Sequence, residues 1–410
     1  MTRLRTAAMA AGAVLVTAAG AQAACGIDRG SVRILSNDFE ALRLVGAAAR
    51  GCGGAGVEVT LNQTIEHKTI QVPALTTDPA TETVAVIANN SIVPLLNEGL
   101  VRPLDDLVAV HGEGLQDRQL VSMGEGVMAV AFMANGQHLF CREDLLAENG
   151  IAPPTTMEEV IAAAETLRAN GVMEHPFASN HKPGWDLAAQ FVNLYLGTGG
   201  DLFAPGSAEL AIDDEDGLAV LDTIRRLTGS MRPDFVTDDA NAIAPLWKEG
   251  ELATIFARGS RARELLDPAE SPYAAVTGLA AMPAMEAGGP PAAALWWDGF
   301  SIARNVSDED AEASFRAMMH ALSPALASEH RGSAVWLIEG YEPLPPAEGV
   351  AANIEGGAPP YPMDPFMGVL HTALSGNLAE FIQGDESAEQ ALDDITAAYE
   401  VAAREAGFLR

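Results

Sequence analysis

Two adjacent tryptophans followed by an aspartate stand out in this chain of 410 residues, which holds only five tryptophans. They are Trp296, Trp297 and Asp298. Neighbouring side chains of an extended strand point to opposite faces, so the two indoles cannot share one environment. We expect one indole to face a core. The other, together with Asp298, would face a packed interface, a binding cleft, or a catalytic pocket in which Asp298 acts as an acid or base.

Catalytic motifs give little support to the last of these possibilities. Residues Ser179 to Lys182 match the S-x-x-K pattern of penicillin-binding enzymes, but the companion K-T-G is absent, because Ile70 follows Lys68 and Thr69. The chain has no G-x-S-x-G turn, phosphate-binding loop, H-E-x-x-H or C-x-x-C motif. Its eight histidines stand singly, without the spacing of metal ligands. We expect no metal, no cofactor and no enzyme activity; a hydrolase using Ser179 or a pair of carboxylates is a remote alternative.

Polar and aromatic residues gather instead where predicted strands end and in the loops that follow. Sheets of α/β proteins bind small ligands at such places. Helix capping competes as an explanation for Asn37 and Asn90, and core packing competes for Trp185 and for one indole of the pair. The candidate ligand-binding residues are Asn37, Asp38, Asn89, Asn90, Asn135, Trp185, Asp186, Arg258, Arg261, Trp296, Trp297 and Asp298.

Alternating strands and helices are the elements that would position these residues. Residues 31–35 and 57–61 alternate as strands around a helical segment at 37–51, and residues 81–90 contain a further strand. A helix is expected to begin at Thr156, where Glu159 completes a capping box. The alternation is typical of a layered α/β fold with a largely parallel sheet.

The first residues have the form of a secretion signal. Two arginines precede an uncharged apolar run, and residues 21–23, Ala-Gln-Ala, match a signal peptidase site. We predict a signal peptide at 1–23 and an exported, soluble protein of the periplasm. A lipoprotein acylated at Cys25 is less favoured, because Gln22 stands where such proteins usually carry leucine.

The charge of the chain excludes one class of partner. The formal charge is −32, and removal of the two arginines of the signal peptide makes it −34. Such a surface repels phosphate backbones and anionic membranes, so nucleic acid is not expected as a partner. No later segment has the length and apolar character of a membrane span.

Two of the three cysteines are expected to form a disulfide, and the third is expected to remain a free thiol. Cys25 and Cys52 bracket the first predicted strand and helix, and an exported chain meets oxidising conditions, so a disulfide between them is expected. Cys141 is left over. Its apolar neighbours predict a buried, unreactive thiol.

The order of four longer segments resembles a known family. They are NEGLVRPLDDLV at 97–108, FMANGQHLFCREDLLAENGIAPPTTMEEVIAAAETL at 132–167, LWKEGELATIFARGSRA at 246–262 and WWDGFSIARNVSDEDAEASFRAMMHALS at 296–323. Together they resemble the periplasmic solute-binding proteins of ABC importers that are related to maltose-binding protein, the extracellular solute-binding protein family 1. The chain departs from the usual pattern at Cys141 and Arg142, where relatives carry Tyr-Asn, and at Met157, where they carry Trp.

The resemblance implies a periplasmic-binding-protein fold of type II, with two α/β lobes joined by hinge strands and a ligand cleft between them. The first lobe would comprise residues 26–135 and 298–345, and the second residues 136–297 and 346–410. The tryptophan pair would then lie where the chain crosses between lobes. Arg261 stands where relatives often carry a stacking tryptophan. The cleft positions of the family favour Asn37, Asp38, Asn89, Asn90, Asn135 and Trp185 and add Phe366.

The function implied by the resemblance is capture of a small polar solute, a carbohydrate before other classes, by closure of the lobes. A monomer would then deliver the solute to the permease subunits of an ABC importer. In such a site, aromatic rings stack on the apolar faces of sugars, and Asn and Asp bind hydroxyl groups. A cationic or quaternary amine is the alternative solute, because two tryptophans beside Asp298 would suit a cation–π site. Ferric iron is not expected, because the five tyrosines are isolated from one another.

Overall fold

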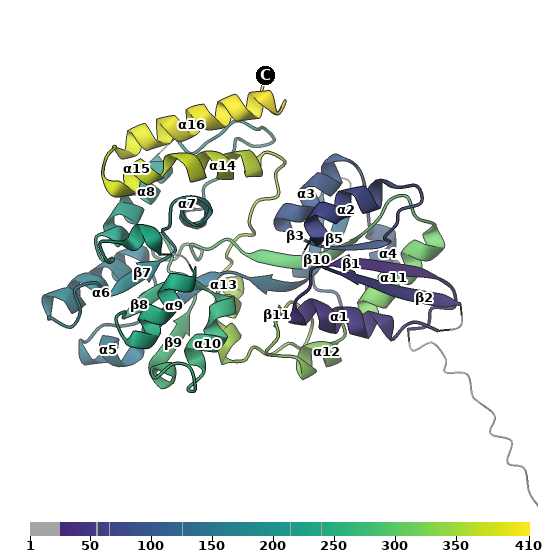
Figure 1. Ribbon diagram of the computed structural model, residues 1–410, viewed down its shortest axis with the longest axis horizontal. Coiled ribbons are helices and arrows are strands. Elements are labelled where there is room, and N and C mark those ends of the chain that lie inside the picture. The colour runs from purple at the N-terminus through teal and green to yellow at the C-terminus, as the bar shows by residue number, and fades with distance from the viewer. Residues whose placement is uncertain (1–24, 55, 65, 125, 214, 239) are drawn as a thin grey trace, which may run out of the picture.

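Two α/β units lie side by side, each built around one β-sheet with helices packed on it (Figure 1). The computed structural model describes residues 25–54, 56–64, 66–124, 126–213, 215–238 and 240–410. The predicted signal peptide at 1–23 lies outside these residues. Strands near the middle of the molecule run from one unit to the other and join the two (Figure 1).

Seven strands form the first sheet: β1 Gly30–Ser36, β2 Val57–Gln63, β3 Val84–Ala88, β4 Leu120–Met123, β5 Gly126–Asn135, β10 Trp296–Ile302 and β11 Val335–Trp336. Their order is β11-β5-β10-β3-β1-β2, with β4 also paired on β5. β1 is parallel to β2 and β3, as a βαβ start requires. β10 is antiparallel to both β3 and β5, and β4 and β11 are antiparallel to β5.

Four strands form the second sheet: β6 Gln137–Arg142, β7 Phe177–Ser179, β8 Thr254–Arg258 and β9 Thr277–Ala280. Their order is β7-β8-β6-β9, and only β7 and β8 are parallel. The prediction of a largely parallel sheet is therefore wrong. The path of the chain explains this, because β5 leads out of the first sheet and β10 leads back into it, so the two run in opposite directions side by side.

Helices cover both faces of the first sheet. They are α1 Glu40–Arg50, α2 His67–Thr76, α3 Asn89–Asn97, α4 Asp105–His111, α11 Asp308–Ala321 and α12 Pro324–Glu329. α1, α11 and α12 pack on one face, and α2 and α3 pack on the other. Alternate residues of β3 show the division: Val84 and Val86 belong to the cluster under α1, whereas Ala85 and Ile87 belong to the cluster under α2.

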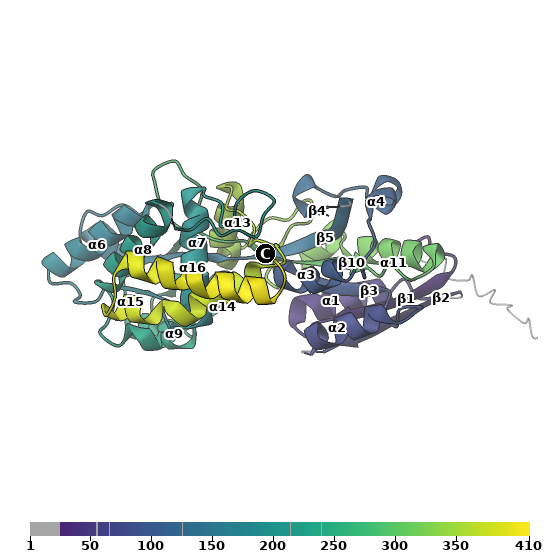
Figure 2. The same ribbon diagram turned by 90° about the horizontal axis from the view of Figure 1, so that it is seen from above.

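The second unit carries the remaining helices. They are α5 Glu143–Glu148, α6 Met157–Ala169, α7 Trp185–Thr198, α8 Glu215–Thr228, α9 Ala240–Glu249, α10 Ala262–Leu266, α13 Glu348–Glu355, α14 Met367–Asn377, α15 Ala379–Gln383 and α16 Ala388–Glu405. α6 begins at the predicted capping box of Thr156 and Glu159. α16 lies along α14 on the outside of the unit (Figure 2). None of the helices in the described residues is both long and apolar enough to span a membrane.

Two asparagines that were expected to cap helices do not do so. α1 begins after Phe39, and Asn37 accepts a hydrogen bond from the N–H of Asp38 at 2.8 Å instead. α3 begins one residue before Asn90, whose Oδ1 atom accepts from Nζ of Lys68 at 3.3 Å. The capping explanation is therefore wrong for both residues.

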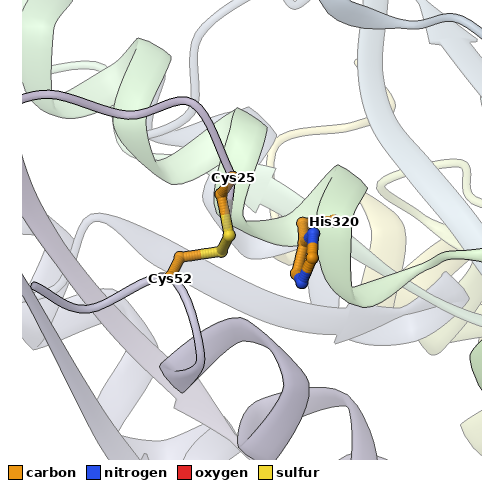
Figure 3. A group of neighbouring side chains, drawn as sticks. All are labelled: Cys25, Cys52 and His320. Atoms are coloured by element: carbon orange, nitrogen blue, oxygen red, sulfur yellow. A yellow bond between two sulfur atoms is a disulfide. The ribbon is translucent and has the colours of Figure 1, made fainter. Parts of the chain in front are cut away.

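The expected disulfide between Cys25 and Cys52 is present, with 5.4 Å between the Cα atoms. It ties the chain before β1 to the end of α1. Cys141 is free and buried, and burial raises the pKa of its thiol to about 12, so the thiol stays protonated and unreactive. His320 lies beside the disulfide on α11 (Figure 3). Because sulfurs joined in a disulfide are not thiolates, this group offers a metal only one ordinary ligand.

Mass spectrometry with alkylation is expected to find one free thiol in the mature protein. Cys141 should react with iodoacetamide only after the protein is unfolded, because its side chain is buried. Cys25 and Cys52 should become reactive only after reduction. Alkylation of either residue in the unfolded but unreduced protein, or an acyl chain on Cys25, would contradict the disulfide.

Candidate functional site

The two units meet where strands pass between the sheets. β5 ends at Asn135 and β6 begins at Gln137, so only Gly136 separates strands of different sheets. β10 returns beside β5, and Trp296 is paired with Asn135. The tryptophan pair therefore lies at the junction of the two units.

The two indoles of the pair face opposite sides of β10. Trp297 is 7% exposed and packs in the hydrophobic cluster between the first sheet and helices α2 and α3. Trp296 is half-buried, stacks on Tyr361 with ring centres 4.2 Å apart, and lies 6.0 Å from the ring of Trp185. One indole thus supports a core and the other reaches the junction, as the alternation of side chains along a strand requires.

Asn89 holds three segments together at the junction and is completely buried. Its Nδ2 group donates to the carbonyl oxygens of Leu295 and Tyr361, at 3.3 and 3.2 Å, and its Oδ1 atom accepts from the N–H of Trp297 at 2.8 Å. These bonds use both polar groups of the amide and leave no surface for a solute. We therefore interpret Asn89 as a structural residue rather than as one that binds the solute.

A narrow pocket, which we call the slot, opens beside Trp296 on the side of the second unit. It spans about 430 Å³ when the open space at its mouth is included, and its enclosed part is narrow. Three residues predicted from the sequence line it, namely Asp186, Arg258 and Trp296. The other lining residues are Gly136, Gln137, Asn180, Ala189, Gln190, Asn193, Ala294 and Tyr361.

Four amide side chains line the slot, and none of them was predicted from the sequence. Nδ2 of Asn193 donates to Oε1 of Gln137 at 2.7 Å. Oδ1 of Asn180 and Nε2 of Gln190 are buried without a hydrogen-bond partner among the described residues. A signal was present in the sequence, because Gln190 and Asn193 lie on the buried face of α7, where apolar residues are usual.

Hydrogen bonds link the aromatic residues beside the slot, namely Tyr361, His371 and Trp185, which we call its aromatic side. The hydroxyl of Tyr361 lies 3.1 Å from Nδ1 of His371, and Nε2 of His371 lies 3.2 Å from the carbonyl oxygen of Trp185. Since a carbonyl only accepts, His371 carries its proton on Nε2 and accepts from Tyr361 at Nδ1. Burial lowers the pKa of His371, and the positive charge of Arg258 lowers it further, so the ring is neutral. The sequence analysis also missed this pair, because local patterns do not bring Tyr361 and His371 to Trp185.

Arg258 and Asp186 are the charged residues of the slot. Arg258 is the last residue of β8, and its guanidinium carbon lies 5.0 Å from the centre of a Trp185 ring. Burial lowers the pKa of Arg258, and the nearby charge of Asp186 opposes the shift. Because arginine stays protonated in proteins, the slot contains a fixed cation next to aromatic rings.

A second polar group lies on the first unit's side of the junction. It consists of Lys68, which donates to Asn90, and Asp298, which is paired in the sheet with Ala88. Burial raises the pKa of Asp298 to about 7, and the positive charge of Lys68 opposes the rise. Asp298 is therefore about half protonated at neutral pH.

Three other predicted residues already have partners close by. Asp38 forms an ion pair with Arg43 at 2.6 Å, and Arg261 forms one with Glu264 at 3.1 Å. Asn135 accepts a hydrogen bond from the N–H of Gly136 at 2.9 Å. None of the three lines the slot.

Phe366 lies away from the slot as well. Its ring contacts Phe203 with centres 4.5 Å apart and Phe408 with centres 5.9 Å apart, inside the second unit. We therefore interpret Phe366 as a packing residue rather than as part of the slot.

Comparison with known proteins shows what the fold is similar to. The chain matches the family described as bacterial extracellular solute-binding protein over residues 51–355. Among solved structures it is similar to the cyclic alpha-maltosyl-1,6-maltose binding protein from Arthrobacter globiformis, with a TM-score of 0.72 and 16% identity over 92% of this chain and 100% of that one. None of the curated proteins matches the chain.

Two further structures have a TM-score of 0.68 and 18% identity: an ABC transporter solute-binding protein from Agrobacterium radiobacter K84 in complex with ribitol, and maltose-bound T. maritima MalE3. The matches cover 92% and 91% of this chain and 99% of each of those chains. At such identities the likeness shows the fold, which is the two-lobed α/β fold of solute-binding proteins. The family match covers most of the sequence, so the resemblance to solute-binding proteins is confirmed. The chain belongs to the bacterial extracellular solute-binding protein family.

Proposed function

We propose that this protein is the solute-binding component of an ABC transporter and that it captures a small carbohydrate or polyol in the slot. The observation that carries the proposal is the stack of Trp296 on Tyr361 beside four amide side chains. Flat rings suit the C–H faces of a sugar, and amides suit hydroxyl groups, which both donate and accept. Ribitol and maltose, the solutes of two related structures, support this class.

Closure of two lobes is part of the proposal. We assign residues 26–135 and 298–345 to the first lobe and residues 136–297 and 346–410 to the second. The solute stabilises the closed form only by its extra affinity for that form. The closed protein, a monomer in the periplasm, then docks on the membrane permease and releases the solute.

A cationic solute is less well supported. Arg258 lies over the ring of Trp185, so the protein's own cation already occupies a position that a quaternary amine would need. A second positive charge in the same slot would be repelled. The half-protonated Asp298 also offers a cation less than a full negative charge.

A hydrolase centred on Ser179 is also less well supported. Ser179 is completely buried, its hydroxyl donates to Oε1 of Gln190 at 3.2 Å, and its oxygen lies 3.4 Å from Nε2 of Gln137. An amide is not a base that would remove the proton of a nucleophilic serine. Ser179 therefore fits a role in orienting the amides of the slot.

A thermal-shift screen of sugars, polyols and quaternary amines tests the solute class. A solute at about 100 times its Kd stabilises the folded protein by about 2.7 kcal/mol, which raises the melting temperature of a chain of this length by roughly 3 °C. We expect such shifts among sugars or polyols. Shifts confined to amines would support the cationic alternative, and turnover of model glycosides would support the hydrolase.

Small-angle X-ray scattering tests closure with the best solute of that screen. The radius of gyration is expected to fall when the slot is saturated, because the two lobes approach each other. A solute that is absent from the thermal-shift hits serves as the control. An unchanged radius at saturation would contradict closure while leaving the binding function intact.

A further inference from the structure

Arg258 differs from the other arginines of the protein in its hydrogen bonds. Every other buried or half-buried arginine in the described residues donates to an oxygen atom, from Arg33 in the first sheet to Arg331 in the loop before β11. Arg258 is half-buried and donates to none of the described residues, although it lines the slot. None of its nitrogen atoms is among the buried atoms without a partner, so its donors remain open to solvent and can be offered to a ligand that supplies acceptors.

The contact that Arg258 does make leaves its donors available. Its guanidinium carbon lies 5.0 Å from the centre of a Trp185 ring, and an aromatic ring offers no oxygen or nitrogen acceptor to its N–H groups. The N–H groups of a guanidinium lie in its plane and point outward as a fork. This fork matches the two oxygens of a carboxylate, which accept two parallel hydrogen bonds.

The charges around the junction also differ from those of the whole chain, which carries −32. The slot itself contains one cation, Arg258, and one carboxylate, Asp186, whose charge acts on Arg258. On the first unit's side, Lys68 stands next to Asp298, which burial holds about half protonated near pH 7. His371, on the aromatic side, is neutral. The positive charges at the junction thus slightly exceed the negative charges. An anionic solute can therefore bind there without net repulsion.

We propose that the preferred solute is an acidic monosaccharide, a uronate or an aldonate, and that Arg258 binds its carboxylate. This inference rests on the proposed function, since the remaining hydroxyl groups of such a solute bind the amides and rings already described. The narrowness of the slot fits entry of one end of a small molecule, with the carboxylate leading. Neutral sugars and polyols of the same skeleton bind the same site without the bond to Arg258.

Isothermal titration calorimetry with matched pairs of solutes tests the proposal. The pairs are glucuronate with glucose, galacturonate with galactose, and gluconate with sorbitol. The wild-type protein should bind at least one acid about 10- to 100-fold more tightly than its neutral partner, the range expected for a charge-assisted hydrogen bond. Arg258→Gln should abolish this preference, because it lowers the affinity for the acid far more than the affinity for the neutral partner, whereas Arg258→Lys should retain part of the preference.

The control is Arg263→Gln, which removes one positive charge from an exposed arginine of α10. It should leave the preference for the acid unchanged, and circular dichroism melts should show that all variants are folded. Equal affinity of the wild type for both members of every pair, or an equal loss for acid and neutral solute in Arg258→Gln, overturns the inference but not the proposed function. If the folded wild type binds no sugar, polyol or sugar acid at all, the proposed function itself is overturned.

Discussion

Trp297→Ala is expected to lower the free energy of unfolding by roughly 3 to 5 kcal/mol, because it leaves a cavity in the cluster between the first sheet and helices α2 and α3. Trp296→Ala should cost the fold much less, since this indole is only half-buried. It should instead weaken solute binding by roughly 1 to 3 kcal/mol, the scale of a lost aromatic contact surface. Urea unfolding and calorimetric titration of the two variants measure both effects.

The neighbouring Trp185→Ala variant serves as a comparison, because Trp185 is 45% exposed and its ring lies 6.0 Å from that of Trp296. It should resemble Trp296→Ala in stability and in its loss of affinity. Equal destabilisation by Trp296→Ala and Trp297→Ala, with solute affinity unchanged in both, would show that neither indole belongs to a binding site.

Asp298→Asn is expected to change how stability depends on pH. Burial raises the pKa of Asp298 from 3.8 to about 7, so the folded state holds a proton that the unfolded state releases. The wild type therefore loses stability as pH rises from about 4 to 7, and the loss is complete above the folded-state pKa. Each pKa unit corresponds to about 1.4 kcal/mol, so this loss amounts to at most about 4 kcal/mol, and solvent screening of the half-buried side chain reduces it.

Unfolding curves recorded between about pH 4 and 8 measure the effect. The Asn variant should lack this component of the pH dependence and should be more stable than the wild type at pH 8. Asp28→Asn, a change at an exposed position, is the control for the lost charge. A variant that loses stability with pH in parallel with the wild type would show that Asp298 is already ionised in the folded protein.

Local patterns in the sequence predicted those features that depend on neighbours along the chain. The opposite environments of Trp296 and Trp297 follow from the geometry of a strand, and the start of α6 follows from the capping box of Thr156 and Glu159. The disulfide was predictable from export and from the position of two cysteines around one βα unit. Each of these inferences needs only a short stretch of sequence.

The slot was only partly predictable, because its residues come together through contacts between distant parts of the chain. Asn89 follows a strand, as a binding residue would, but its carbonyl partners lie 206 and 272 positions further along the chain. Gln137 and Asn193, which are hydrogen bonded to each other, are 56 positions apart. No periodicity or local motif reports such pairings. The family resemblance supplied the fold, but it did not distinguish an amide that faces a solute from one that fastens two segments.

Asn89 also restricts how the protein moves. Because one side chain is bonded to Leu295, Trp297 and Tyr361, the returning strand and the segment that leads to α14 cannot slide past each other without breaking those bonds. Any bending at the junction that keeps these bonds must move the two segments together. The lobe closure proposed above is therefore constrained at the junction by an amide that contacts no solute.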